Sequence, residues 1–140
     1  MKPRYSIVLP AFNESHGLSD IVEEIVREVS GIDSEFEIVI VDDGSSDNTW
    51  EVICKLGRKH SQVRALRFAR NFGHQVAVHA GIRAAKGETV AVMDSDGQDP
   101  ADLLPVMFNK IEAEGYDVVN CVRKKRKESA ARRACFFIFY

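Results

Sequence analysis

Cysteine is scarce in this sequence, and it is not spaced like a metal ligand. Cys54, Cys121 and Cys135 are the three cysteines among 140 residues, and they form no C-x-x-C pair. An odd count without paired spacing argues against a disulfide framework and against a zinc site. The cysteine content therefore fits a reducing compartment such as the cytosol.

Long apolar runs are missing as well. Met1 is followed by Lys2, Pro3 and Arg4, which lead into a strand-like segment and not into the apolar core of a signal peptide. No stretch approaches the roughly 18 apolar residues of a membrane-spanning helix. We therefore expect these 140 residues to be neither exported nor inserted across a membrane.

No low-complexity linker or internal repeat divides the chain, and its length is that of one domain. Short β-branched runs alternate with longer segments of helical period. The predicted strands cover residues 5–9, 36–41, 63–68, 89–93 and 118–122, and the predicted helices begin near Leu18, Thr49, Gln75 and Pro100. This alternation is typical of an α/β three-layer sandwich, in which helices cover both faces of a mostly parallel sheet.

Acidic and small polar residues follow three of the predicted strands. They occupy residues 10–15, 42–47 and 94–99. In an open α/β sheet, ligands bind at the carboxyl ends of the strands. We therefore expect the three loops to meet at one edge of the sheet and to form the functional site.

The loop after the fourth predicted strand carries Asp94, Asp96 and Gln98. Alternate side chains of an extended backbone point the same way, so these three could share a hard cation such as Mg²⁺ or Mn²⁺. The same residues also suit an Asp- and Gly-rich turn before a helix. Taken alone, the loop leaves both interpretations open.

The loop after the second predicted strand also has two interpretations. Residues 44–47 suit a turn followed by a helix cap. That does not explain the adjacent carboxylates of Asp42 and Asp43, which repel each other unless something binds them. Such a carboxylate can accept a hydrogen bond from a base or a ribose hydroxyl, as in dinucleotide folds. Those folds themselves are excluded, because no G-x-G-x-x-G follows the first strand.

The loops taken together resemble the motif series of family 2 glycosyltransferases. The series consists of PAFNE at residues 10–14, VDDGS at 41–45 and DSDGQDP at 94–100, in the family's order and at about its spacing. Two further segments, RNFG at 70–73 and VRKKR at 122–126, are similar to the subgroup of dolichyl-phosphate mannose synthase and bacterial polyprenyl-phosphate glucosyltransferases. The resemblance covers nearly the whole chain and implies the nucleotide-diphospho-sugar transferase (GT-A) fold for residues 1–122.

The resemblance also implies a role for each motif residue. The implied nucleotide-binding residues are Pro10, Phe12, Glu14, Asp42, Asp43, Asp94 and Ser95. Asp94, Asp96 and Arg123 are the implied catalytic residues, and Asp96 with Gln98 would hold Mg²⁺ or Mn²⁺. The chain departs from many relatives after Gln98, where Pro100, Ala101 and Asp102 replace two prolines and a glutamate. We interpret this departure as a tolerated helix start.

The reaction implied by the resemblance is attack by an acceptor oxygen on the anomeric carbon of a nucleotide-diphosphate sugar, with inversion. The implied acceptor is a polyprenyl phosphate, whose oxygen is already anionic near neutral pH, so no strong general base is required. A non-catalytic nucleotide-binding or interaction module is the alternative. A phosphoacceptor receiver domain is disfavoured, because residues 63–68 lead into Ala69 and Arg70 and not into an aspartate. None of the histidines is predicted to act in catalysis.

Basic and aromatic residues are concentrated in residues 123–140. Between Arg123 and Arg133 seven basic residues and one acidic residue give a local charge of +6. The whole chain has a net charge of −2, so the remaining residues together carry −8. The aromatic run at 136–140 follows, and it needs something to bury against. These features predict an interfacial helix on the cytoplasmic side of an anionic membrane. A solvated helix face is the plainer alternative, and no nucleic-acid recognition motif is present.

The aromatic end also bears on the wider protein. We expect the sequence to stop inside a longer protein, whose remainder could anchor it in a membrane and carry acceptor-binding elements. A second copy of the chain could also bury residues 136–140, so a homo-oligomer is a further expectation.

Overall fold

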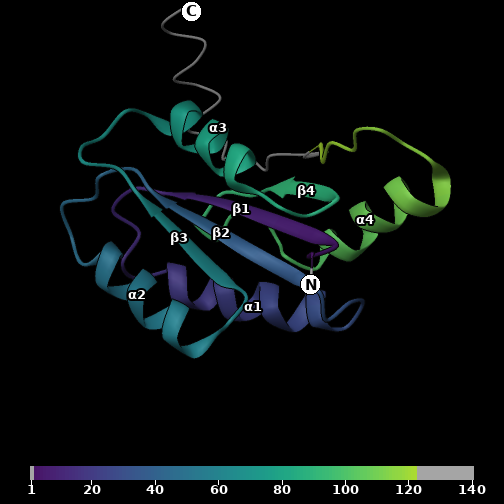
Figure 1. Cartoon of the computed structure of the whole chain (residues 1–140), viewed down its shortest axis with the longest axis horizontal. Helices are drawn as coiled ribbons and strands as arrows, with labels where there is room; N and C mark the ends of the chain where they lie inside the picture. Colours follow the sequence, from purple (N-terminus) through teal and green to yellow (C-terminus); the bar gives the residue numbers. More distant parts are fainter. Residues whose placement is uncertain (1, 123–140) are drawn as a thin grey trace, which may run out of the picture.

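The computed structural model describes residues 2–122. Strands and helices alternate along the chain: β1 (Tyr5–Ala11), α1 (Leu18–Ser30), β2 (Phe36–Asp42), α2 (Thr49–Lys59), β3 (Val63–Arg67), α3 (His74–Ala84), β4 (Thr89–Val92) and α4 (Leu103–Glu114). The strands form one parallel sheet in the order β3-β2-β1-β4. In Figure 1, α3 lies above the sheet, and α1 and α2 lie below it. The predicted three-layer α/β sandwich is confirmed.

Both faces of the central strands are buried. Every residue of β1 and β2 is buried, because helices cover the sheet on each side. Ile7 and Leu9 point into the core formed with α1, α2 and α4, whereas Val8 points into the smaller core beneath α3. The alternation along β1 therefore supplies both layers of the sandwich.

The apolar residues of α1 form a stripe along one side of the helix. Its i, i+3, i+4 spacing brings five side chains onto the face that meets the sheet, and all five are buried: Leu18, Ile21, Val22, Ile25 and Val29. Full burial of one such side chain contributes roughly 1.5–3 kcal/mol. Gly31 follows the helix in the C-cap position.

The start of α4 differs from the prediction. This helix was expected to begin near Pro100, but it begins at Leu103, with Asp102 in the N-cap position. The preceding residues form a turn, in which the backbone N–H of Leu103 donates to the Pro100 carbonyl at 3.3 Å. Pro100 therefore starts a turn that leads into the helix and is not its first residue.

The prediction of a strand over residues 118–122 is wrong. This segment makes no ladder with β4 within residues 2–122, and Val118 and Val122 are 72% and 81% exposed. A groove of about 650 Å³ lies between it, β4 and α4. Strand propensity alone was therefore insufficient, because a strand also needs a neighbouring backbone at hydrogen-bonding distance.

A search of residues 2–122 finds no helix that could cross a bilayer. The interfacial helix predicted for residues 123–140 lies outside the described part of the chain.

We expect Gly81→Ala to destabilise the fold by about 1–3 kcal/mol, because α3 approaches β1 closely at this point. A Cβ atom on Gly81 would lie 2.3 Å from Val8 Cγ1, inside the buried core beneath α3. Urea unfolding measures the effect. Gly57→Ala in α2 is the matched control, since its nearest neighbour would be the Val63 carbonyl at 3.9 Å. The control should be neutral or more stable by up to about 1 kcal/mol, and equal losses in both variants would contradict the packing argument.

Candidate functional site

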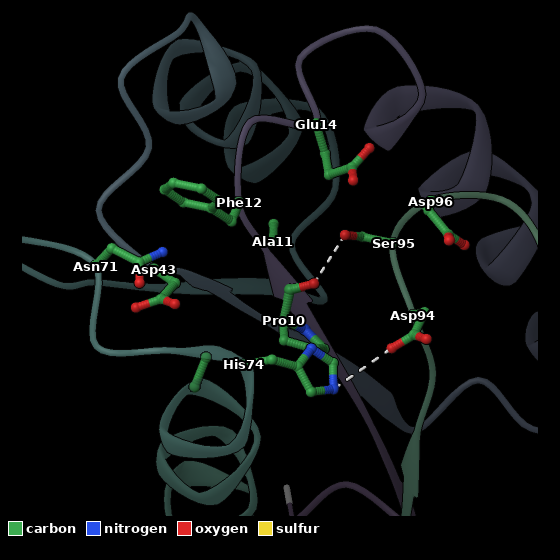
Figure 2. Close-up of a pocket in the computed structure, with 11 residues that line it drawn as sticks. Pro10, Ala11, Phe12, Glu14, Asp43, Asn71, His74, Asp94, Ser95 and Asp96 are labelled. Atoms are coloured by element: carbon green, nitrogen blue, oxygen red, sulfur yellow. Dashed lines mark hydrogen bonds and ion pairs between the residues drawn. The ribbon is translucent and has the colours of Figure 1, made fainter. Parts of the chain in front are cut away.

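A pocket of about 250 Å³ opens at the carboxyl ends of β1 and β4 (Figure 2). Four segments line it: the loops after β1, β2 and β4, and the start of α3 with the residues before it. The lining residues are Pro10, Ala11, Phe12, Glu14, Asp43, Asn71, His74, Ala77, Asp94, Ser95 and Asp96. The three acidic loops therefore meet at one edge of the sheet, as expected.

Most of the residues singled out in the sequence lie in this pocket. Those that line it are Pro10, Phe12, Glu14, Asp43, Asp94, Ser95 and Asp96. Asp42 and Gln98 do not line it. Arg123 lies outside the described residues.

Hydrogen bonds tie the loop after β1 to the loop after β2. Asn13 has a left-handed backbone with φ 58°. Its backbone N–H donates to Ser45 Oγ at 3.0 Å, and its Oδ1 accepts from the backbone N–H of Ser46 at 2.9 Å. The backbone N–H of Glu14 donates to Thr49 Oγ1 at 2.8 Å. These contacts hold Glu14 at the edge of the pocket.

The Asp47 carboxylate accepts hydrogen bonds within the same pair of loops. It accepts from the backbone N–H groups of Thr49 at 3.0 Å and Ser15 at 3.3 Å. Hydrogen bonds from Thr49 first, and then from Ser15, lower the pKa of Asp47 to about 2. Asp47 therefore caps the start of α2, as the turn-and-cap interpretation predicted.

Asp43 anchors the segment that leads into α3. Its Oδ1 accepts from the backbone N–H of Phe72 at 2.8 Å, and its Oδ2 accepts from that of Gly73 at 2.9 Å. The next residue, Gly44, has φ +68°, and a Cβ there would lie 2.3 Å from the Arg70 backbone. The loop after β2 therefore fixes both Asp43 and the start of α3 against the pocket.

Asp42 does not reach the pocket, contrary to the expectation that it binds the nucleotide. Its side chain is fully buried; Oδ1 accepts from the backbone N–H of Ser45 at 2.9 Å, and Oδ2 lies 3.2 Å from Arg67 Nε. The two adjacent carboxylates point to opposite sides of the strand end, because successive side chains alternate there. The repulsion considered above is relieved by protein groups.

The loop after β4 places Asp94 and Asp96 in the pocket but directs Gln98 elsewhere. Ser95 Oγ is buried and donates to the Pro10 carbonyl at 2.7 Å (Figure 2), which joins this loop to β1. Gly97 then turns the chain with φ +72°. Gln98 lines the apolar groove beside β4. The predicted alternation through Gln98 assumed an extended backbone, which this turn interrupts.

The family is settled by a comparison with known protein families. Residues 6–134 match the model described as glycosyl transferase family 2. The chain belongs to this family.

Relatives of the glycosyltransferase include longer bacterial proteins. The chain is 37% identical over 142 residues to the uncharacterized glycosyltransferase YkcC of Bacillus subtilis, covering 98% of this chain and 42% of that protein. It is 36% identical over 129 residues to the undecaprenyl-phosphate 4-deoxy-4-formamido-L-arabinose transferase of Edwardsiella ictaluri, covering 91% and 39%. The chain therefore spans about two fifths of the length of these relatives.

Solved structures confirm the GT-A fold of the glycosyltransferase. A mannosyltransferase from Pyrobaculum calidifontis, solved with GDP-Man and Mn²⁺, superimposes with a TM-score of 0.75 at 23% identity, covering 89% of this chain and 36% of that one. TarS of S. aureus, solved with UDP-GlcNAc, gives a TM-score of 0.69 at 21% identity, covering 89% and 38%. At these identities the likeness concerns the fold.

The pocket of this family 2 glycosyltransferase has one strongly acidic wall. Glu14, Asp94 and Asp96 all line it. Burial first, and then the charges of Asp96 and Asp47, raise the pKa of Glu14. Within residues 2–122 no three His, Cys, Asp or Glu side chains are grouped closely enough to hold a metal ion by themselves. Two carboxylates completed by ligand oxygens and water are, however, the donor set that Mg²⁺ accepts, so a divalent cation fits this wall.

Two residues that line the pocket were given no role in the site from the sequence, although Asn71 belongs to the RNFG segment noted there. Asn71 and His74 lie in the pocket, at the end of the loop after β3 and at the start of α3 (Figure 2). They follow the carboxyl end of a parallel strand, so the rule that located the acidic loops applies to them too.

Proposed function

We propose that this chain is the nucleotide-sugar-binding part of an inverting, divalent metal-dependent glycosyltransferase that acts on a polyprenyl phosphate. The observation that carries the proposal is the pocket at the carboxyl ends of β1 and β4, where Asp94 and Asp96 face the start of α3. This is where an open α/β sheet binds ligands. A mannosyltransferase of the same fold, solved with GDP-Man and Mn²⁺, supports a donor of this chemical class.

Different residues of the pocket suit the base, the ribose and the diphosphate of the nucleotide-sugar donor. Phe12 is 45% exposed at the pocket edge and offers a ring to stack on the base, and Pro10 and Asp43 line the same pocket. Asp94 and Glu14 offer carboxylates to ribose hydroxyls. The diphosphate then lies between Asp96 and the start of α3, which places the sugar at the open side of the pocket.

Asp96 would hold the divalent cation, with Asp94 as the second carboxylate on the same wall in place of Gln98. When bound, such an ion neutralises charge on the departing diphosphate. The chain's own residues position the donor: Ser95 holds the loop after β4 to β1, and Asp43 holds α3 on the opposite side. Positioning of this kind suits an acceptor that is already anionic.

The acceptor is proposed from the relatives, because the described residues contain only the donor side of the site. Two fifths of a relative's length matches this chain, and a relative is named as an undecaprenyl-phosphate transferase. An acceptor phosphate oxygen attacks the anomeric carbon of the sugar. The bond between that carbon and the nucleoside diphosphate breaks, the diphosphate leaves, and the configuration of the carbon inverts. Arg123, outside the described residues, is proposed to meet the phosphate oxygens.

Calorimetric titration tests the donor assignment. UDP, GDP and their sugar conjugates should be titrated with and without Mn²⁺. We expect one nucleotide series to bind, and to bind more tightly with the ion. If neither series binds at millimolar concentration under either condition, the proposed function is wrong.

A non-catalytic nucleotide-binding module is a second candidate, favoured by the short span of the chain relative to its relatives. Sugar transfer to a polyprenyl phosphate separates the two candidates. We expect the 140-residue chain to bind the donor but to transfer sugar feebly.

We also propose that residues 123–140 dock on anionic membranes. Seven basic residues each contribute on the order of 1 kcal/mol near such a surface, so attachment should be measurable at low salt and lost at high salt. Vesicle sedimentation compares the full chain with a version that ends at Val122. Indistinguishable binding of the two to anionic vesicles at low salt would refute this proposal.

A further inference from the structure

His74 is the first residue of α3, and its ring lies in the pocket opposite the loop after β4 (Figure 2). Its Nε2 is 3.7 Å from Asp94 Oδ1. We propose that His74 is a phosphate-binding residue of the donor site, which donates a hydrogen bond to the diphosphate of the nucleotide. This proposal rests on the function proposed above and adds a residue to it.

The charges around the pocket carry the inference. Glu14, Asp43, Asp94 and Asp96 are carboxylates, and a diphosphate facing them alone would be repelled. Across the pocket from the loop after β4, the lining residues include His74, whose imidazole offers an N–H donor. Two other side chains of the pocket can donate a hydrogen bond, the Asn71 amide and the Ser95 hydroxyl. The Ser95 hydroxyl already donates to the Pro10 carbonyl. If a cation on the acidic wall holds the diphosphate, the hydrogen bond from the opposite side of the pocket comes from His74.

The backbone holds His74 in this place. Asp43 accepts from the N–H groups of Phe72 and Gly73, the two residues before it. The N–H groups of Val76 and Ala77 then donate to the Gly73 carbonyl at 3.0 and 3.2 Å, which starts α3 at the pocket. Position 74 is therefore set by the same carboxylate that lines the base side of the site.

The contact between His74 and Asp94 leaves the imidazole able to turn toward a ligand. At 3.7 Å the two atoms are beyond hydrogen-bonding distance, and each side chain is 53% exposed. Rotation of the ring toward a phosphate oxygen therefore breaks no buried interaction. A purely structural histidine at this position would be packed and hydrogen-bonded.

The test compares a nucleoside with its diphosphate. In calorimetric titrations with Mn²⁺ present, His74→Ala should weaken binding of UDP or GDP at least tenfold, because a hydrogen bond to a charged group is lost. Binding of the matching nucleoside should stay within twofold of wild type, since it has no phosphate. His74→Gln keeps an N–H donor at similar reach and should recover part of the affinity. His79→Ala is the matched control, because His79 is an exposed residue of α3 that does not line the pocket.

Each outcome bears on the proposal. Wild-type affinity of His74→Ala for the diphosphate overturns it, while the proposed function stands. Equal weakening of nucleoside and diphosphate also overturns it, because His74 would then shape the pocket. If His74→Ala weakens binding of a short-chain polyprenyl phosphate but not of the nucleoside diphosphate, His74 contacts the acceptor, and the proposal is overturned as well. Failure of the wild-type chain to bind any nucleoside diphosphate refutes the proposed function itself.

Discussion

Asp96→Asn is expected to weaken binding of the nucleoside diphosphate at least tenfold in the presence of Mn²⁺ and to remove most of its dependence on the ion. Asp96 lines the acidic wall, and an amide is a poorer ligand for a hard cation than a carboxylate. The fold should be retained, because Asp96 lies on an exposed loop, where it accepts a hydrogen bond from the backbone N–H of Gln98 at 2.9 Å. The substitution should also lower the pKa of Glu14, which Asp96 helps to raise.

Calorimetry with Mn²⁺ and with excess chelator measures this effect. Asp20→Asn is the matched control, since it makes the same change of charge on the exposed surface of α1, away from the pocket. The control should bind like the wild-type chain under both conditions. Equal affinity of the wild-type chain for the diphosphate with Mn²⁺ and with chelator would contradict the metal assignment.

Asp43→Ala should have two effects, a loss of stability of about 3 kcal/mol and weaker nucleoside binding even without metal. The stability loss is expected because the N–H groups of Phe72 and Gly73 would lose a charged acceptor at a partly buried site. The binding loss is expected because Asp43 lines the base side of the pocket and fixes the segment that carries Asn71 and His74.

Urea unfolding and nucleoside titration together measure both effects of Asp43→Ala. Asp43→Asn serves as the graded variant, because its amide keeps one carbonyl acceptor for the two N–H groups. It should lose less stability than Asp43→Ala. An unstable Asp43→Ala variant that binds nucleoside with wild-type affinity would show that the carboxylate only anchors α3.

The layers of the fold could be predicted because they depend on how regularly apolar residues recur along the sequence. The stripe on α1 and the β-branched runs of β1 and β2 each require burial on a defined face, and few architectures satisfy both. Loop positions followed from the rule that ligands bind at the carboxyl ends of parallel strands. The location of the pocket was therefore predictable before any side-chain geometry.

The direction of individual side chains was less predictable, because it depends on turns and on neighbours distant in sequence. Asp42 and Asp43 are adjacent, yet one pairs with Arg67 in the interior and the other faces the pocket. Gln98 is directed away from Asp96's wall by the turn at Gly97. His74 was overlooked because a histidine at a helix start has many uses, and only the fold places it across from Asp94.

Mapping the bound ligand on the protein by NMR tests the proposed donor site. Backbone amide shifts of the ¹⁵N-labelled chain should be followed as Mg²⁺ and the preferred nucleoside diphosphate are added together. The largest changes are expected on residues 11–14, 71–74 and 94–96 and on Asp43. Saturable changes confined to the groove beside β4 or to the outer faces of α1 and α2, with the pocket unchanged, would contradict the proposed donor site.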